Sequence, residues 1–118
     1  MKAADYVRAS RFLDEARRTC DAALLSEVDL LALPSTVRAA VSIESTEQDD
    51  PTVGLTRLTA AFNLTGQPAC SVPCGLTKEG LPVGLQLVGR RFDERTVLRA
   101  VHVFETRSDL PELRPPLD

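Results

Sequence analysis

The chain has 118 residues, of which 43% are hydrophobic and 26% charged, and it carries a formal net charge of −3. This composition is typical of a globular protein and excludes a disordered or fibrous one, and the length predicts a single domain over residues 1–118. The 14 basic residues are scattered among 17 acidic ones, so no basic patch predicts a nucleic-acid partner.

The first half of the chain predicts a helix, a strand and a long loop. Residues 4–26 place apolar side chains at intervals of three and four, which is typical of an amphipathic helix. Residues 28–33 form a short apolar run that Pro34 ends, as expected of a buried strand. Residues 35–54 are rich in Ser, Thr, Asp and Glu and show no period, so we expect an exposed loop there.

The next elements are a second helix and a hairpin. Residues 55–65 carry an apolar stripe, and Gly66 follows at the position of a helix C-cap. Residues 69–73 and 83–89 are two apolar segments separated by a short connection that contains Lys78, Glu79 and Gly80. Two such segments so close in sequence predict an antiparallel hairpin.

The last predicted element is a helix over residues 94–107, for which Asp93 is a suitable N-cap. The order of elements is therefore helix, strand, helix, strand, strand, helix. This order predicts an α/β fold with three helices and about three strands in a mixed sheet that includes the antiparallel hairpin. Because three strands are few for a free-standing sheet, we expect at least one sheet edge to be open.

The cysteines and the apolar runs indicate a cellular compartment. Cys20, Cys70 and Cys74 are odd in number, which favours reduced thiols over a disulfide framework. The polar N-terminus lacks the apolar segment of a signal peptide, and the longest apolar runs are far shorter than the ~20 residues that span a bilayer. We expect a cytoplasmic protein with no membrane partner.

Two segments carry a specific motif. Residues 58–75 read LTAAFNLTGQPACSVPCG and residues 80–89 read GLPVGLQLVG, followed by Phe92-Asp93-Glu94. Both closely resemble the C-terminal signature of the amidase-signature family, and the similarity extends over about residues 6–105. Ala61 departs from the Pro that is common at that position in the family.

The resemblance implies a fold and an activity. The fold would be a large mixed sheet wrapped by helices, to which this chain contributes the last strands. The activity would be amide hydrolysis by a Ser–cis-Ser–Lys triad, with no metal and no organic cofactor. The Gly/Ser-rich segment that holds the nucleophile has no counterpart in these 118 residues. We therefore expect the C-terminal portion of an amidase-signature enzyme, with the catalytic residues upstream and the isolated chain inactive.

The same resemblance implies that the second helix and the loop before it approach the acyl pocket. Arg57, Thr59 and Asn63 are then the candidate substrate-binding residues. Thr59 and Asn63 are four residues apart and share a helix face. An alternative for Asn63 is a hydrogen bond to nearby backbone at the end of the helix, and both interpretations stay open at this stage.

Catalysis by the chain itself has little support in the sequence. A nucleophile such as Ser71 needs an oriented base within hydrogen-bond distance, whereas His102 lies in a predicted helix and Lys78 in a predicted turn. We expect Ser71 to bond a neighbouring backbone group and His102 to be a partly buried packing residue. Cys70 and Cys74 lack the further ligands that a zinc site requires, so no catalytic residue and no metal site is expected.

The expected partners are the missing N-terminal catalytic portion or a separate chain, together with an amide substrate in the intact enzyme. We also expect the isolated chain to self-associate through an unpaired strand edge. An alternative function is a non-catalytic interaction subunit that docks on a separate catalytic chain. A third possibility is a small self-sufficient hydrolase that uses Ser71.

Overall fold

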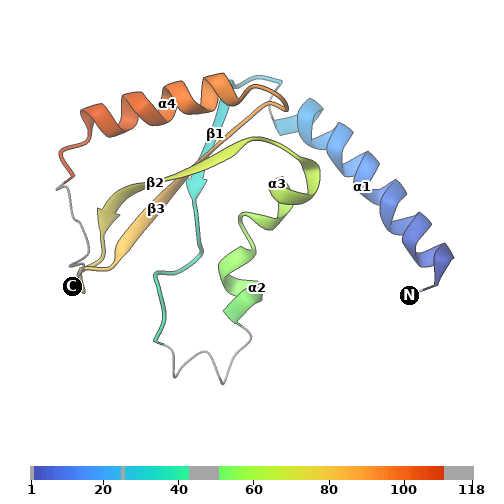
Figure 1. Cartoon of the computed structure of the whole chain (residues 1–118), viewed down its shortest axis with the longest axis horizontal. Helices are drawn as coiled ribbons and strands as arrows, with labels where there is room; N and C mark the ends of the chain where they lie inside the picture. The colour runs from blue at the N-terminus through green and yellow to red at the C-terminus, as the bar shows by residue number, and fades with distance from the viewer. Residues whose placement is uncertain (1, 25, 43–50, 111–118) are drawn as a thin grey trace, which may run out of the picture.

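Three antiparallel strands form the centre of the structure, a computed structural model that describes residues 2–24, 26–42 and 51–110. The strand order is β1-β3-β2, so β3 is central (Figure 1). The strands are β1 (Leu30–Pro34), β2 (Ala69–Leu76) and β3 (Pro82–Gly89). The predicted α/β class and the hairpin are confirmed, but the sheet is antiparallel throughout rather than mixed. The direction of β1 was not predictable because a long segment separates it from its partner β3, and residue pattern alone does not fix the direction of such a strand.

The two faces of β3 have different surroundings. Leu85 and Leu87 point to the face that packs against the helix at the C-terminal end of the chain, and Leu87 is part of the main apolar cluster. Gln86 and Val88 point to the opposite face because side chains alternate along a strand. Val88 is the one fully buried large side chain among the described residues. The central strand is therefore the most buried element of the sheet.

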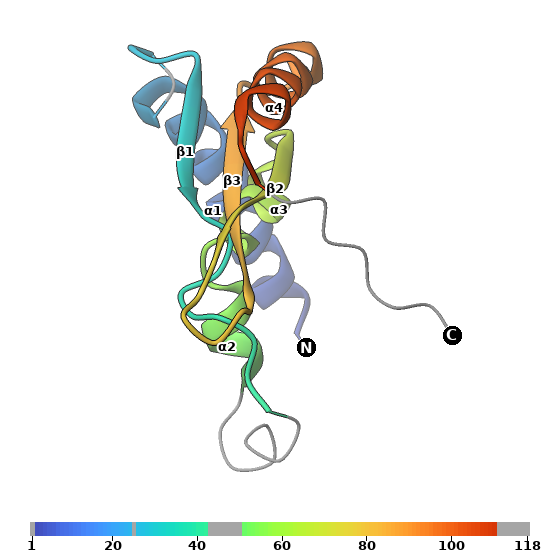
Figure 2. The ribbon, with the colours of Figure 1, turned by 90° about the vertical axis from the view of Figure 1, so that its left-hand side faces the viewer.

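α4 (Glu94–Arg107) covers one face of the sheet and has the predicted bounds. Asp93 caps it, since the Asp93 carboxylate accepts a hydrogen bond from the Thr96 N–H at 3.3 Å. The buried residues Val97 and Val101 pack onto β2 and β3. In the side view, β1 lies on one side of β3 and α4 on the other (Figure 2). The helix thus leaves β1 largely uncovered.

The predicted helix over residues 55–65 is two short helices, α2 (Pro51–Thr56) and α3 (Ala60–Thr65). The loop predicted for residues 35–54 is therefore too long at its end, because Pro51 begins a helix, as proline often does. Residues 35–42 contain no helix or strand, and residues 43–50 lie outside the described part. The Gly66 cap is confirmed, with φ of 83° and an N–H to the Phe62 carbonyl at 2.8 Å.

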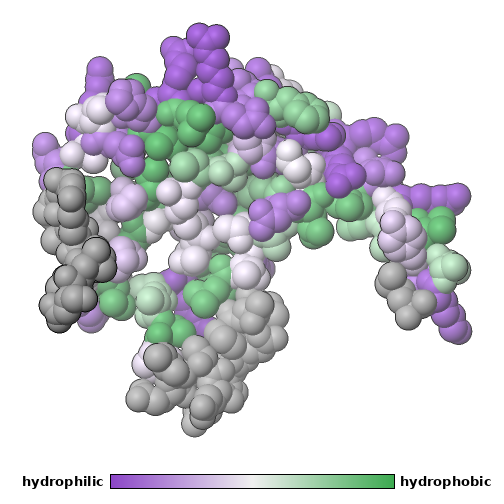
Figure 3. All heavy atoms as spheres, viewed as in Figure 1, coloured by the Kyte–Doolittle hydropathy of each residue, from purple (hydrophilic) through white to green (hydrophobic). Residues whose placement is uncertain are grey.

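α1 (Ala3–Leu24) projects away from the sheet (Figure 1) and packs mainly against α3. The apolar face that the sequence predicts is only partly covered, since Leu13, Ala16 and Cys20 are half-buried and Tyr6 is 62% exposed. Phe12 is 75% exposed. Hydrophobic side chains accordingly appear on the surface of α1 and near α4 (Figure 3). In the described part of the chain, no helix is both long and apolar enough to cross a membrane.

The molecule is extended for its length. Its radius of gyration is 17.3 Å, whereas a compact domain of this length has about 13–14 Å. Its accessible surface is 9261 Å², whereas a compact monomer of 12.8 kDa exposes roughly 6,300 Å². The chain therefore leaves far more surface uncovered than a free-standing domain of its size.

Candidate functional site

The three predicted substrate-binding residues lie in the turn between α2 and α3 and in α3 itself. Arg57 lies in this turn with an exposed side chain. Thr59 precedes α3, and both its N–H and its hydroxyl donate to the Thr56 carbonyl, at 3.0 and 3.1 Å. Asn63 lies one helical turn further on, and its N–H donates to the Thr59 carbonyl at 3.1 Å. Thr59 and Asn63 are therefore neighbours, as their spacing predicts.

The Asn63 side chain is exposed and makes no hydrogen bond within the described residues. The alternative prediction, a hydrogen bond between the Asn63 side chain and nearby backbone, is therefore wrong for the described residues. Its amide group is available to a molecule outside the described chain, and so is the Arg57 guanidinium, which has no ion pair within the described residues.

A buried glutamine fixes this turn to the sheet. Gln86 is 4% exposed and lies in the central strand. Its Nε2 donates to the Leu58 carbonyl at 3.1 Å, which joins the turn to β3. The pattern of residues 83–89 predicts only a strand, although a Gln among apolar residues in a central strand is a usable signal, because buried amides need partners.

The end of α3 is held by a second polar contact. The Thr65 hydroxyl is bonded to the Ala61 carbonyl at 2.7 Å and to the side-chain amide of Gln67. Both Thr65 and Gln67 are buried. Polar contacts therefore join the turn before α3 to the sheet and close the C-terminal end of α3.

A pair of serine hydroxyls meets over the central strand. Ser35, just after β1, and Ser71, in β2, are hydrogen-bonded to each other through their Oγ atoms. Gly84 makes the approach possible, because a Cβ atom at that position would lie 2.7 Å from Ser35 Oγ and 2.9 Å from Ser71 Oγ. The expected Ser71 bond to backbone is replaced by this side-chain bond.

The serine pair has no base in the described part of the chain. Neither hydroxyl is bonded to a basic or acidic side chain there. His102 is exposed on α4 rather than partly buried as predicted, and Lys78 is exposed in the turn between β2 and β3. An activated nucleophile needs such a base within hydrogen-bond distance, and within the described residues the two hydroxyls are bonded only to each other.

The cysteines lie in different environments. Cys70 packs against the apolar cluster under α4. Cys74 is exposed at a β-bulge between Pro73 and Gly75, and its thiol donates to the Val83 carbonyl at 3.4 Å. Among the described residues no group of three His, Cys, Asp or Glu side chains could hold a metal ion.

Comparison with known proteins gives one consistent family. The sequence profile of the Amidase family matches residues 1–98. A glutamyl-tRNA(Gln) amidotransferase subunit of Methanosarcina mazei is 43% identical over 112 residues, which is 94% of this chain and 23% of that protein. The corresponding amidotransferase subunit of Parvibaculum lavamentivorans is 45% identical over 89 residues, or 75% of this chain and 18% of that protein.

Solved structures show the same relationship. A 6-aminohexanoate cyclic dimer hydrolase in complex with its substrate aligns with a TM-score of 0.88 and 22% identity, over 98% of this chain and 27% of that one. The glutamyl-tRNA(Gln) amidotransferase subunit of Thermotoga maritima aligns with a TM-score of 0.71 and 33% identity, over 90% of this chain and 24% of that one. The chain thus spans about a quarter of the length of the proteins that it matches.

Proposed function

Because this chain belongs to the Amidase family, we propose that it supplies core strands and one wall of the substrate pocket of an amide hydrolase. The observation that carries the proposal is the match over nearly the whole chain to about a quarter of much longer relatives. In this proposal the nucleophilic serine, the cis-serine and the lysine come from sequence outside these 118 residues. The chain contributes no catalytic residue.

The chemistry follows the mechanism that the family resemblance implies. The serine attacks the amide carbonyl while the lysine, through the cis-serine, moves the proton to the leaving amine. The acyl-enzyme is then hydrolysed or passed to another amine. No group of this chain takes part in bond making or breaking, and its part is to position the acyl group.

The proposed substrate wall is the α2–α3 turn. Arg57 and Asn63 present exposed polar groups, and Thr59 lies between them. Gln86 holds this segment on the sheet through the Leu58 carbonyl. A polar segment that is fixed on a rigid strand is well suited to orient a bound substrate.

The proposal is tested with a chimera. The matched segment of the Methanosarcina mazei amidotransferase is replaced by this chain, and ammonia release from simple primary amides is measured for the chimera and for the isolated chain. We expect turnover by the chimera and none by the isolated chain. Turnover by the isolated chain that disappears in Ser71→Ala would instead establish a self-sufficient hydrolase.

The substrate wall is tested in the same chimera. Asn63→Ala and Arg57→Ala are expected to raise KM about tenfold or more while kcat changes less, because they remove binding rather than chemistry. Lys78→Ala is the control, since this exposed lysine lies in the turn between β2 and β3. Equal effects of Asn63→Ala and Lys78→Ala would remove Asn63 from the proposed pocket.

A second candidate is a non-catalytic protein that docks on a separate catalytic chain. The large uncovered surface of the molecule favours it as much as a covalent connection. A mixing experiment distinguishes docking from a covalent connection. If a separate catalytic chain gains activity when this chain is added, docking is supported. If only the covalent chimera is active, the first proposal is supported.

A further inference from the structure

The Ser35–Ser71 hydroxyl pair is assembled by all three strands of the sheet. The Ser35 N–H donates to the Gly84 carbonyl at 2.9 Å, so the residue that follows β1 is still bonded to β3. Ser71 lies in β2 opposite Gln86. The two hydroxyls meet above Gly84, where a Cβ atom would displace them. The pair therefore depends on a glycine and on two segments that are far apart in the sequence.

The hydroxyl pair lies on the same face of the sheet as the candidate substrate wall. Residues directly opposite each other in antiparallel strands place their side chains on one face, so Ser71 and Gln86 share a face. On this face the Gln86 amide donates to the Leu58 carbonyl and thereby holds the α2–α3 turn. Gln86 is buried, whereas Ser71 is exposed. The hydroxyl pair therefore lies beside the turn, where the sheet is left uncovered.

One hydroxyl hydrogen of the pair has no partner in the described part of the chain. Each serine hydroxyl can donate one hydrogen bond and accept two, and the bond between the two oxygens uses a single hydrogen. The serine that accepts this bond keeps its own hydrogen free. Because successive hydrogen bonds polarise one another, that hydroxyl is a better donor than an isolated serine. The pair is therefore suited to bind a neutral acceptor such as a carbonyl oxygen.

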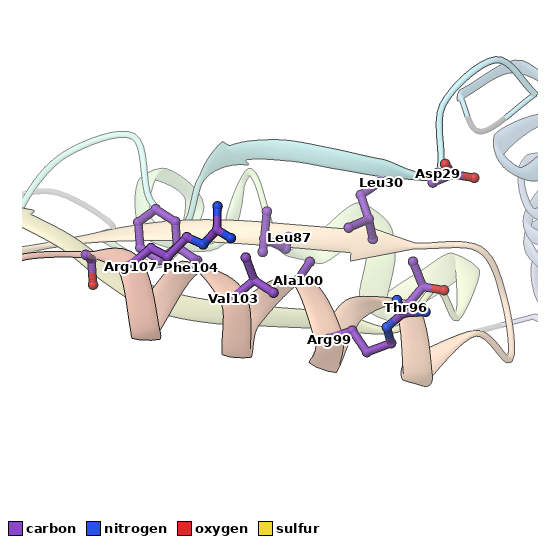
Figure 4. A pocket seen from close by; sticks show the side chains of 10 residues that line it. Asp29, Leu30, Leu87, Thr96, Arg99, Ala100, Val103, Phe104 and Arg107 are labelled. Carbon is purple, nitrogen blue, oxygen red and sulfur yellow. The ribbon is translucent and has the colours of Figure 1, made fainter.

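The face of the sheet under α4 carries a hollow of a different character. Its volume is about 780 Å³, and Leu30, Ala100 and Val103 are among the side chains that line it (Figure 4). Its polar side chains lie toward its two ends, with Thr96 at one end and Arg107 at the other (Figure 4). A site for a small molecule instead needs polar groups that converge on the ligand. The Ser35–Ser71 pair brings two polar groups together beside the proposed substrate wall.

We propose that the Ser35–Ser71 pair determines substrate specificity by donating its free O–H to a second carbonyl oxygen in the acyl group of the amide. The substrate class is then an amide whose acyl chain carries a ketone, ester or amide carbonyl besides the scissile one. The inference rests on the proposed function, because it places the acyl group along the α2–α3 turn. The pair binds this oxygen and takes no part in breaking the amide bond.

The test compares matched amides in the amidotransferase chimera described above. Pyruvamide, acetoacetamide and levulinamide carry a ketone on the second, third and fourth carbon of the acyl chain. Isobutyramide, isovaleramide and isocaproamide carry a methyl branch at the same carbons and have no second carbonyl. For at least one pair, the ratio of kcat/KM between the keto amide and its branched partner is expected to fall at least about fivefold in Ser35→Ala/Ser71→Ala, because one hydrogen bond to the substrate is lost.

The ratio separates binding of the ketone from a general loss of structure, because destabilisation lowers the turnover of both amides of a pair. Ser35→Ala and Ser71→Ala each leave one hydroxyl, so each single variant is expected to keep a larger ratio than the double variant. Thr36→Val is the matched control, since the Thr36 hydroxyl donates to the Arg38 carbonyl at 2.7 Å, and its ratio should equal that of the unchanged chimera. An unchanged ratio in the double variant, or an equal fall in Thr36→Val, overturns the proposal.

A second measurement does not depend on turnover. If the chimera releases no ammonia, binding of the same amide pairs is followed by ligand-observed NMR. We expect the affinity ratio of at least one pair to fall at least about fivefold in the double variant. This result without hydrolysis would count against the proposed function and leave the present inference standing. The same affinity ratio in both proteins for every pair overturns the inference.

Discussion

Two glycines of β3 determine how closely other residues approach the central strand. A Cβ atom at Gly89 would lie 2.6 Å from Val97 Cγ2, and Val97 is a buried residue of α4. At Gly84, the Ser35 and Ser71 hydroxyls occupy the space that a side chain would need. A glycine inside a strand leaves room for a close neighbour, and the structure identifies that neighbour in each case.

Gly89→Ala is expected to destabilise the fold by about 1–3 kcal/mol, because α4 must move away from the sheet to admit the methyl group. Gly75→Ala is the control, since nothing lies within 4 Å of a Cβ atom there, and it should change stability by less than about 0.5 kcal/mol. Urea unfolding of both variants measures the difference. Similar midpoints would contradict the close packing of Val97 on Gly89.

Gly66 and Gly80 both have positive φ, 83° and 81°. The sequence predicts the cap at Gly66 and places Gly80 in a short connection, and the structure shows that both positions need the conformation that glycine adopts most easily. We expect Gly66→Ala and Gly80→Ala each to cost about 1 kcal/mol. Thermal unfolding of the two variants checks this, and a fully neutral Gly80→Ala would disagree with the observed turn.

The hydrogen bond between the Ser35 and Ser71 hydroxyls can be tested only by comparing two single variants with the double variant. Ser35→Ala and Ser71→Ala each remove one partner of the same hydrogen bond. We expect each to cost about 0.5–1.5 kcal/mol and the double variant to cost less than their sum. A double-mutant cycle in urea gives the coupling energy, and strict additivity would mean that the two hydroxyls do not interact in solution.

At the scale of elements, helices with strong local signals and the β2–β3 hairpin were predictable, whereas the partner of β1 was not. α4 has a capping aspartate and a continuous apolar stripe, and its predicted bounds are those observed. The helix predicted for residues 55–65 divides in two, at a turn whose Leu58 carbonyl bonds Gln86, 28 residues further along the chain. The sequence marks Gln86 as an amide that needs a partner if it is buried, but no local pattern reports that the partner is the Leu58 carbonyl.

Gln86→Leu should loosen the α2–α3 turn. The Leu58 carbonyl would lose its buried partner, which costs about 1–3 kcal/mol. Hydrogen exchange is expected to speed up at residues 57–63 more than in α4, whose contacts with the sheet do not involve the Gln86 amide. Uniformly faster exchange throughout the chain would indicate general destabilisation instead of a local anchor.

At the scale of the whole molecule, the amino-acid composition does not predict that so much of the surface is left uncovered. A composition typical of a globular protein does not show whether its apolar residues meet one another in the fold. Here Tyr6, Phe12 and Val103 stay largely exposed. The resemblance motifs predicted a part of a larger fold, but the position of the uncovered surface depends on which strands α4 covers, and this is set by tertiary packing.

The open edge of β1 predicts self-association of the isolated chain. The edge of β1 has unpaired backbone groups and no protective charge, so two copies are expected to pair there at tens of micromolar concentration. Ala32→Lys should weaken the association, because a charge on an edge strand opposes further pairing. Sedimentation of both proteins is the measurement. A monomer at every concentration, or no effect of Ala32→Lys, would contradict pairing through β1.

The pairing of β1 also has a consequence for the order in which the structure forms. The connection that the β1–β3 pairing closes, from Pro34 to Leu85, is roughly ten times as long as the one from Leu76 to Pro82, and closing it costs about 2 kcal/mol more in chain entropy. The hairpin and α4 can therefore assemble as a local unit, while β1 joins late and detaches first. Detachment of β1 uncovers one edge of β3, so the strand expected to join last is also the most transient part of the sheet.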